Sequence, residues 1–323
     1  MKLDRAGLTG LLQADDAAFA PVFERAGEVC RAQFGDTVRI RALLEFSNHC
    51  KRRCRYCGLN CANTALPRFR LTPDDMVHTA LEAARCGYQT IVLQSGEDPF
   101  FTPDLLASIV GRIKRAAPGL AVTLSCGEFP AEAYRRFRDA GCDRYLLKHE
   151  TADPDLYAAL HPDSSLEERV GCLRAIKAAG LEAGGGFMVG LPGQTAQTIA
   201  DDLLLLQSIP CDMAGIGPFL PHPDTPLGAE QPGSASLTLR AVALARLLLP
   251  QANLPVTTAL GVLDPQAAGR VYEGGGNVVM RKVTPPHLRK LYQIYPASFP
   301  ETTIEEGRRA LEQSLRARGK IPV

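Results

Sequence analysis

The chain has 323 residues, 46% of them hydrophobic, and this is enough for one large buried core. Its 36 basic residues nearly balance its 35 acidic residues, so no net field directs the protein to nucleic acid or to an acidic membrane surface. The apolar runs are too short to cross a bilayer, and the first residues lack the apolar core of a signal peptide. We therefore expect a cytoplasmic protein that binds neither nucleic acid nor membrane.

A polar, helix-like segment comes first, and strand-like and helix-like runs alternate after it. Helix starts are marked clearly, because Thr72 and Thr102 each precede a proline and an acidic residue, the usual order of an N-cap and a first turn. The expected strands are Val38–Phe46, Thr90–Gln94, Ala121–Ser125, Arg144–Lys148, Glu182–Val189, Met213–Pro218, Val256–Ala259 and Asn277–Met280.

This alternation, sustained over about eight units, predicts parallel strands joined by crossover helices. We predict an α/β fold, a (βα)8 TIM-type barrel over residues 36–300. An N-terminal helical extension is expected over residues 1–35, and a C-terminal capping helix within residues 301–323. A doubly wound open sheet is the alternative fold.

The ten cysteines are unevenly placed, because Cys50, Cys54, Cys57 and Cys61 fall within twelve residues. The first three have the spacing Cys-x3-Cys-x2-Cys and directly follow the first predicted strand, at the end where parallel α/β folds collect their chemistry. Three thiolates can hold three irons of a [4Fe–4S] cubane and leave the fourth iron open to a small molecule. An electron-transfer cluster takes four cysteines. We therefore predict a reactive cluster bound by Cys50, Cys54 and Cys57.

Cys61 leaves other interpretations open. It could complete a four-cysteine zinc site in a binding or scaffold protein, although zinc ligands usually come as two Cys-x2-Cys pairs separated by a longer loop. It could also be the fourth ligand of a ferredoxin-like cluster. A group of four thiols without any metal would be an oxidation liability. We expect Cys61 to take no part in metal binding, and the scattered cysteines to be small buried apolar residues.

The cysteine spacing, with Tyr56 before the third cysteine, resembles the signature of the radical S-adenosylmethionine (SAM) superfamily. The surrounding residues are similar to the branch that contains biotin synthase, methylornithine synthase and the HydE-type [FeFe]-hydrogenase maturases. The resemblance covers roughly residues 38–296. The strings most similar to HydE-type maturases are Thr90–Pro99, Asp143–Thr151, Met188–Thr195, Gly215–Pro226 and Pro255–Ala259.

The resemblance implies an enzyme that cleaves SAM reductively at one [4Fe–4S] cluster. The resulting 5′-deoxyadenosyl radical would act on a sulfur-containing, organometallic substrate, a cysteine-bound iron carbonyl cyanide fragment, in assembly of the [FeFe]-hydrogenase active-site cluster. Transient contacts with other hydrogenase maturases and with an electron donor are implied too. Because no cysteine follows Cys211, we expect no auxiliary cluster. Rearrangement of lysine, as by a methylornithine synthase, is the alternative reaction.

The same resemblance implies which residues bind SAM. Ser95 and Glu97 lie in the loop that approaches the methionine amine, and Arg169 matches the position expected to hold the carboxylate, which a guanidinium fork suits. Without the resemblance, these residues would be an ordinary βα turn and a solvated helix residue. The full cofactor-binding set is Tyr56, Gln94, Ser95, Glu97, Ser125, Glu150, Arg169 and Tyr292.

The expected substrate residues would place hydroxyls and a cation inside the barrel, as a small anionic ligand requires. Lys148 stands where the family string more often has arginine, and lysine lacks the bidentate fork. Gly184–Gly186 lies within a predicted strand and indicates either the close approach of a cofactor or a bulge. We expect His149 and His222 to make local hydrogen bonds. The substrate-binding set is Thr123, Arg144, Thr257 and Thr258.

Overall fold

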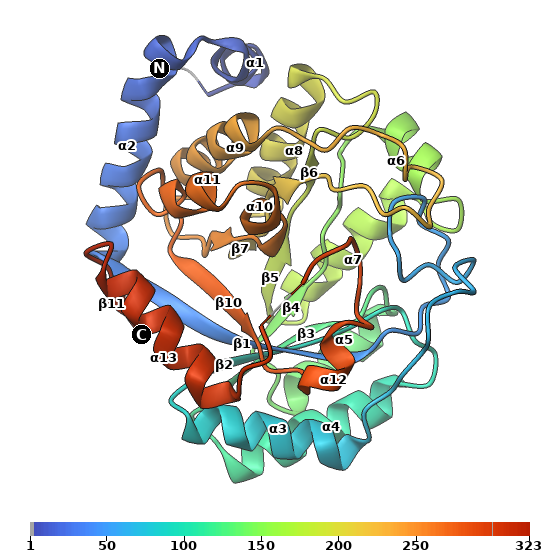
Figure 1. Ribbon diagram of the computed structural model, residues 1–323. Coiled ribbons are helices and arrows are strands. Elements are labelled where there is room, and N and C mark those ends of the chain that lie inside the picture. The colour runs from blue at the N-terminus through green and yellow to red at the C-terminus, as the bar shows by residue number, and fades with distance from the viewer. Residues whose placement is uncertain (1–2, 299) are drawn as a thin grey trace.

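A barrel of parallel strands, surrounded by helices, forms the centre of the molecule (Figure 1). The computed structural model describes residues 3–298 and 300–323, so residues 1, 2 and 299 of the predicted regions lie outside it. The barrel strands are β1 (Thr37–Ser47), β2 (Thr90–Ser95), β3 (Ala121–Ser125), β4 (Arg144–Leu146), β5 (Glu182–Gly185), β7 (Met213–Ala214), β9 (Pro255–Val256) and β10 (Val278–Lys282).

The order of these strands decides between the two predicted folds. Hydrogen-bonded neighbours run β7, β5, β4, β3, β2, β1, β10, β9, and every pair is parallel. A bridge between Met213 and Asn253 joins the two ends of this sheet. The order follows the chain around the barrel without the reversal of a doubly wound sheet. The predicted TIM-type barrel is therefore confirmed.

Helices on the outer side connect successive strands. Thr72 and Thr102 are the N-caps of the first two crossover helices, as predicted, and their side chains accept hydrogen bonds from first-turn amides. Leu106, Ile109 and Ile113 are buried at helical spacing, which turns one face of their helix toward the strands. The helices between barrel strands are α3 (Pro73–Arg85), α4 (Pro103–Ala116), α5 (Ala131–Asp139), α6 (Pro154–Leu160), α7 (Leu166–Ala178), α8 (Ala196–Ser208), α9 (Ala235–Leu248), α10 (Thr258–Leu263) and α11 (Pro265–Arg270). The short helix α12 (Pro286–Arg289) follows the last barrel strand.

Strand β1 shows how the barrel separates its core from its interior. Ile40, Ala42 and Leu44 belong to the apolar core between strands and helices. The alternate residues Arg41, Leu43 and Glu45 line an internal cavity. This alternation follows from the two-residue period of a strand, and it places charged side chains inside the barrel.

Four predicted strands end earlier than expected, and the one predicted over Arg144–Lys148 ends at Leu146. Glu182–Val189 and Met213–Pro218 each divide, and their second parts, β6 (Met188–Val189) and β8 (Gly217–Pro218), pair with each other. The strand predicted over Val256–Ala259 is wrong after Val256, because Thr257 becomes the N-cap of α10 and accepts a hydrogen bond from the amide of Leu260 at 3.4 Å.

Close contacts with neighbouring segments of the chain explain why residues 184–186 are glycine. A Cβ added at Gly184 would lie 2.7 Å from Leu146 Cδ1 and 2.8 Å from Met213 Cε. One added at Gly186 would lie 2.3 Å from the carbonyl oxygen of Gly215. These glycines therefore allow the close approach of neighbouring segments of the chain, and the approach of a cofactor to them stays a prediction.

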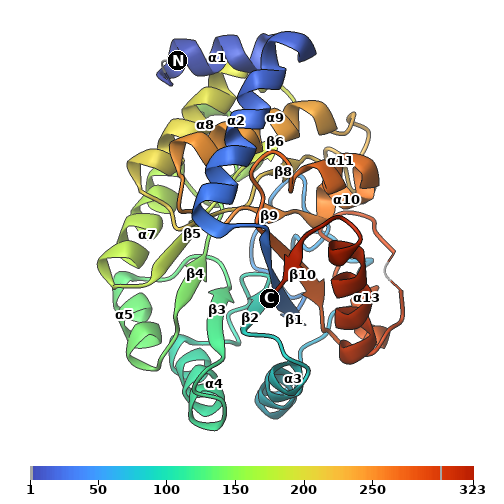
Figure 2. The same cartoon turned by 90° about the vertical axis from the view of Figure 1, so that its left-hand side faces the viewer.

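The N-terminal helices lie on the outside of the helix layer, whereas the C-terminus lies beside the start of β1 (Figure 2). Helix α1 (Arg5–Gln13) packs against α8, and α2 (Asp16–Phe34) packs against α9. The expected C-terminal helix is α13 (Ile304–Arg316), which covers the outer side of the barrel beside α3 and β10. The last strand, β11 (Ile321–Pro322), pairs with the start of β1. Among the described residues, no helix is long and apolar enough to cross a membrane.

Candidate active site in the barrel interior

A cavity of about 360 Å³ occupies the barrel interior. All eight predicted cofactor-binding residues line it, although they come from six different segments of the chain. Of the predicted substrate residues, Thr123, Thr257 and Thr258 also line the cavity. The structure thus brings together residues as far apart in the sequence as Tyr56 and Tyr292, because parallel strands end at the same side of a barrel. Their roles remain predictions.

The three predicted cluster ligands lie together beside this cavity. Cys50 and Cys57 line it. Burial raises the pKa of the Cys54 thiol to about 12, and the neighbouring Cys50 adds to this shift. Burial also raises the pKa of Cys57 well above its usual value, with further contributions from Cys54 and Cys50. The three cysteines are half-buried. Three adjacent thiols with raised pKa values become thiolates together only beside positive charge, so these three side chains fit an iron–sulfur cluster.

Cys61 has different surroundings. It is exposed, and its Sγ lies 3.4 Å from the carbonyl oxygen of Lys51, to which the thiol donates. Over the described part of the chain, no three His, Cys, Asp or Glu side chains gather as the ligands of one metal ion. This arrangement argues against a four-cysteine zinc site, whose ligands surround a single ion. The irons of a cubane lie at separate corners and need no such convergence.

Gly96 determines how closely the cysteine loop approaches strand β2. Its amide donates a hydrogen bond to the carbonyl oxygen of Ser47 at 3.1 Å. A Cβ added at Gly96 would lie 2.3 Å from the carbonyl oxygen of His49 and 2.8 Å from Cys50 Cβ. Neither atom can rotate away, because one belongs to the backbone of the cysteine loop and the other is bonded directly to it. A side chain at Gly96 would therefore have to displace Cys50, the first predicted cluster ligand.

We therefore expect Gly96→Ala to lose most of its iron after reconstitution, and to lower the free energy of unfolding by about 1–3 kcal/mol through overpacking. Iron assay and chemical denaturation measure the two effects. Gly119→Ala is the matched control, because a Cβ there meets no atom within 4 Å. Wild-type iron content in Gly96→Ala would show that the loop does not need this close contact.

Glu150 adopts an unusual backbone conformation at the cavity wall. Its φ is +66°, which is costly for a residue other than glycine. Its amide donates to the carbonyl oxygen of Gly186 at 3.0 Å, and its carboxylate pairs with Lys148 Nζ at 2.9 Å. Lys148 is thus already paired with Glu150. This pairing argues against a role for Lys148 as a substitute for an arginine that binds a substrate carboxylate. Such strain is common where a side chain must point into a functional site.

The two predicted histidines have different local surroundings. His149 is fully buried, and burial lowers its pKa to about 3, which keeps the ring neutral. Its Nε2 lies 3.3 Å from Asp202 Oδ1, but neither ring nitrogen makes a hydrogen bond within the described chain, so the local hydrogen bond predicted for His149 is wrong. His222 Nδ1 accepts a hydrogen bond from the amide of Asp224 at 3.2 Å. Neither histidine lines the cavity.

Arg144 does not belong to the cavity wall, and its predicted place there is corrected. Its Nε donates to Glu182 Oε2 on the adjacent strand at 2.6 Å, so a protein carboxylate already neutralises it. Arg41 supplies a cation inside the cavity instead. It is 2% exposed, and its Nη1 lies 2.9 Å from Met213 Sδ. Burial, and then the charge of Arg144, lowers the pKa of Arg41 to about 9.

Sequence reasoning missed several charged residues of the site. Glu45 and Lys282 both line the cavity and form an ion pair at 2.7 Å. With Arg41, Glu45 occupies alternate positions of a predicted strand, so the two-residue period could have indicated that both face the interior. Arg52 and Glu128 were missed as well, and both contact predicted cofactor residues from behind the cavity wall.

The family model of the radical SAM superfamily matches residues 44–206. The chain is 50% identical over 296 residues to the [FeFe] hydrogenase maturase subunit HydE of Thermotoga maritima, covering 91% of this chain and 84% of that protein. It is 29% identical over 258 residues to 3-methylornithine synthase of Methanosarcina acetivorans, covering 79% and 72%. The crystal structure of a methylornithine synthase shares the fold, with a TM-score of 0.87 at 24% identity over 100% of this chain and 95% of that one.

Proposed function

Because this chain belongs to the radical SAM superfamily as an enzyme of the HydE type, we propose that it binds one [4Fe–4S] cluster through Cys50, Cys54 and Cys57. The superfamily implies the cluster and SAM as cofactors. The observation that carries the ligand assignment is the proximity of these three half-buried thiols, of which Cys50 and Cys57 line the cavity. The absence of cysteine after Cys211 supports a single cluster.

When bound, the cluster supplies the electron that cleaves SAM reductively to methionine and a 5′-deoxyadenosyl radical. The chain itself would bind and orient SAM, with Arg169 at its carboxylate and Glu97 at its amine. Gln94 Nε2 donates to the hydroxyl of Tyr292 at 3.2 Å, which ties the segment after α12 to β2 above the interior. A walled cavity excludes water, and a primary carbon radical needs that protection. Ser95, Ser125, Glu150 and Tyr56 would complete this half of the site.

We propose that the substrate occupies the rest of the cavity, near Thr123, Thr257 and Thr258. Thr123 is 1% exposed, and its hydroxyl has no hydrogen-bond partner among the described residues. Arg41 adds a buried cation whose Nε likewise has none within the described chain. Buried polar groups without partners favour a polar or anionic ligand. A cysteine-bound iron carbonyl cyanide fragment meets that requirement, and its sulfur would be the target of the radical.

The resemblance to the maturase also supports proposals about partners. The enzyme would work in the cytoplasm, receive its electron from a donor protein and contact other hydrogenase maturases transiently. Lys51 and Arg55 are exposed on the cysteine loop, so an acidic donor could dock close to the cluster. Such a surface favours fast, transient encounters rather than a stable complex.

A maturation assay tests the function. Anaerobically reconstituted protein should be brown and hold about four irons per chain. Added to hydrogenase apoprotein with the other maturases, it should restore hydrogen evolution, and omission of the protein should leave the hydrogenase inactive. Conversion of lysine in the presence of SAM and reductant would instead indicate a methylornithine synthase. About eight irons would contradict the single cluster, and a colourless zinc protein would contradict the enzyme.

A further inference from the structure

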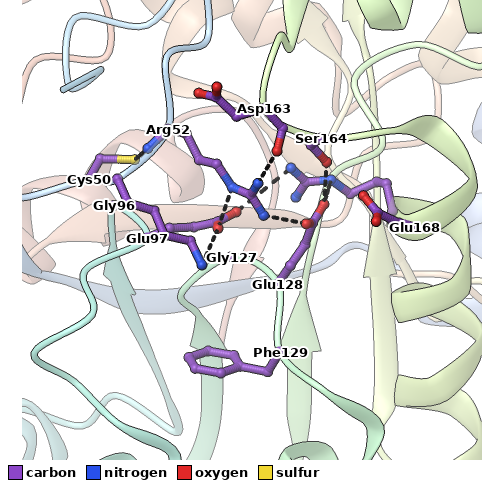
Figure 3. Close-up of polar contacts among 12 residues, drawn as sticks. Cys50, Arg52, Gly96, Glu97, Gly127, Glu128, Phe129, Asp163, Ser164 and Glu168 are labelled. Carbon is purple, nitrogen blue, oxygen red and sulfur yellow. Dashed lines mark hydrogen bonds and ion pairs between the residues drawn. The ribbon is translucent and has the colours of Figure 1, made fainter. Parts of the chain in front are cut away.

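Four charged side chains form a ring at one wall of the cavity: Arg52, Glu97, Arg169 and Glu128. Figure 3 shows Arg52 between the two carboxylates, Glu97 and Glu128. Arg52 Nε donates to Glu97 Oε2 at 2.6 Å, and its Nη2 donates to Glu128 Oε2 at 2.5 Å. Arg169 Nε pairs with Glu128 Oε1 at 2.8 Å. The fourth side, from Arg169 Nη2 to Glu97 Oε1, is wider, at 3.8 Å. The charges alternate around the ring and sum to zero.

The two halves of this ring have different surroundings. Glu97 and Arg169, on its wide side, line the cavity, whereas Arg52 and Glu128 lie outside the lining. The four side chains are between 9% and 15% exposed. At such burial, removal of one charge leaves its partner uncompensated at considerable cost. Arg52 and Glu128 can therefore act on a bound ligand only through Glu97 and Arg169.

Arg52 also connects the ring to the cysteine loop. It lies between Cys50 and Cys54, and its amide donates to Cys50 Sγ at 3.4 Å. Its Nη1 donates to the carbonyl oxygen of Asp163, in the segment before α7 (Figure 3). The amide of the preceding Lys51 donates to the carbonyl oxygen of Glu97 at 2.9 Å. One side chain thus joins the loop of the predicted cluster ligands to three other segments.

Residues around the ring leave room for its side chains and form hydrogen bonds with them. Gly127 has φ +85°, and a Cβ added there would lie 1.8 Å from Glu97 Cγ, so glycine leaves room for this carboxylate. Ser164 Oγ donates to Glu128 Oε1 at 3.0 Å. Burial works against the charge of Arg169, but the nearby Tyr157, Glu128 and Glu97 outweigh it and raise the pKa of the guanidinium. Arg169 therefore stays cationic at the cavity wall.

We propose that Arg52 and Glu128 are positioning residues, which orient Arg169 and Glu97 for the amino-acid end of SAM and register the cluster loop against them. This inference rests on the proposed cofactor site. Lys51 Nζ lies 3.8 Å from Glu97 Oε2, and its side chain is 52% exposed, so it compensates Glu97 only weakly. Without Arg52, both carboxylates of the ring would therefore draw on Arg169 and compete with the carboxylate of SAM for it. Without Glu128, Arg169 would keep the hydrogen bond from its Nε to the Tyr157 hydroxyl at 3.1 Å but would lose the nearer of its two charged partners, which helps to fix its direction. Both changes should therefore weaken SAM binding.

The test compares reconstituted Arg52→Gln and Glu128→Gln with the wild-type holoenzyme. We expect SAM to bind about 10–100-fold more weakly to each variant, since buried charge pairs are coupled by energies of this size. We also expect an incomplete SAM-induced change in the electron paramagnetic resonance spectrum of the reduced cluster. Arg52→Lys should recover part of the affinity, because lysine keeps the charge without the fork. Arg53→Gln is the matched control, since Arg53 is the next residue and its side chain is 63% exposed.

The outcomes separate the inference from the proposed function. Wild-type SAM affinity and spectrum in both ring variants would overturn the positioning role. Tighter binding by Glu128→Gln would also overturn it, because removal of a competing carboxylate would then outweigh orientation. If Arg52→Gln fails to retain a cluster, Glu128→Gln decides, since Glu128 lies far from the loop in sequence. A wild-type protein without cluster or SAM binding would contradict the proposed function itself.

Discussion

Cys54→Ala is expected to hold no intact [4Fe–4S] cluster and to form no detectable 5′-deoxyadenosine, whereas Cys61→Ala is expected to match the wild type in both respects. Cys54 is half-buried, and its place beside Cys50 and Cys57 is visible in the pKa values, because Cys50 adds to the raised pKa of Cys54, and both add to the raised pKa of Cys57. Loss of one of three thiolates leaves two irons without protein ligands, and such a cluster cannot direct SAM to a single open iron. Cys61 is exposed and engages a backbone carbonyl instead.

Iron and sulfide assay, together with chromatography of the SAM cleavage products, measure both expectations. Denaturation curves of the metal-free forms show whether Cys54→Ala has only lost its ligand or has also lost its fold. Equal loss of iron in Cys54→Ala and Cys61→Ala would favour a site with four cysteines. Full iron content in Cys54→Ala would remove this residue from the ligand set.

Arg169→Gln is expected to raise the KM for SAM by about 30-fold or more, because truncation of one partner of a buried charge pair costs about 2–5 kcal/mol. Arg169 is the cation on the cavity side of the ring, and its side chain is 9% exposed. The variant leaves Glu97 and Glu128 with Arg52 as their only guanidinium in the ring. Their excess negative charge would then repel the carboxylate of SAM in addition to the lost hydrogen bonds.

Steady-state formation of 5′-deoxyadenosine over a range of SAM concentrations measures this effect. Arg174→Gln is the control, because Arg174 lies on the same helix α7 and is exposed. Arg169→Lys should be intermediate, since it keeps the charge but loses the planar fork. An unchanged KM in Arg169→Gln would assign the carboxylate of SAM to another residue.

Part of the site was beyond prediction from the sequence. Arg52 and Arg53 are adjacent and chemically identical, but one closes a buried ring of charges and the other is exposed. Nothing local distinguishes them, because the difference depends on where Glu97 and Glu128 lie after folding. Arg144 was placed wrongly for the same reason, since Glu182, on the neighbouring strand, neutralises it.

The sequence by itself determined the elements whose signals are local. These signals depend on residues only a few positions apart. They are the N-caps at Thr72 and Thr102, the strand around Ala42 and the spacing of Cys50, Cys54 and Cys57. The parallel order of the strands followed from their alternation with helices. These features indicated a barrel and a reactive cluster before any contact was known.

Only the tertiary structure decided which side chains share the cavity and which charges compensate each other. The Arg52 ring joins four segments, and the pair of Glu45 with Lys282 joins strands at opposite ends of the sequence. Coulomb energy depends on distance in space and on burial, neither of which sequence separation reveals. The cysteine spacing therefore indicates the kind of chemistry, and the contacts of the folded chain decide how its binding residues are held.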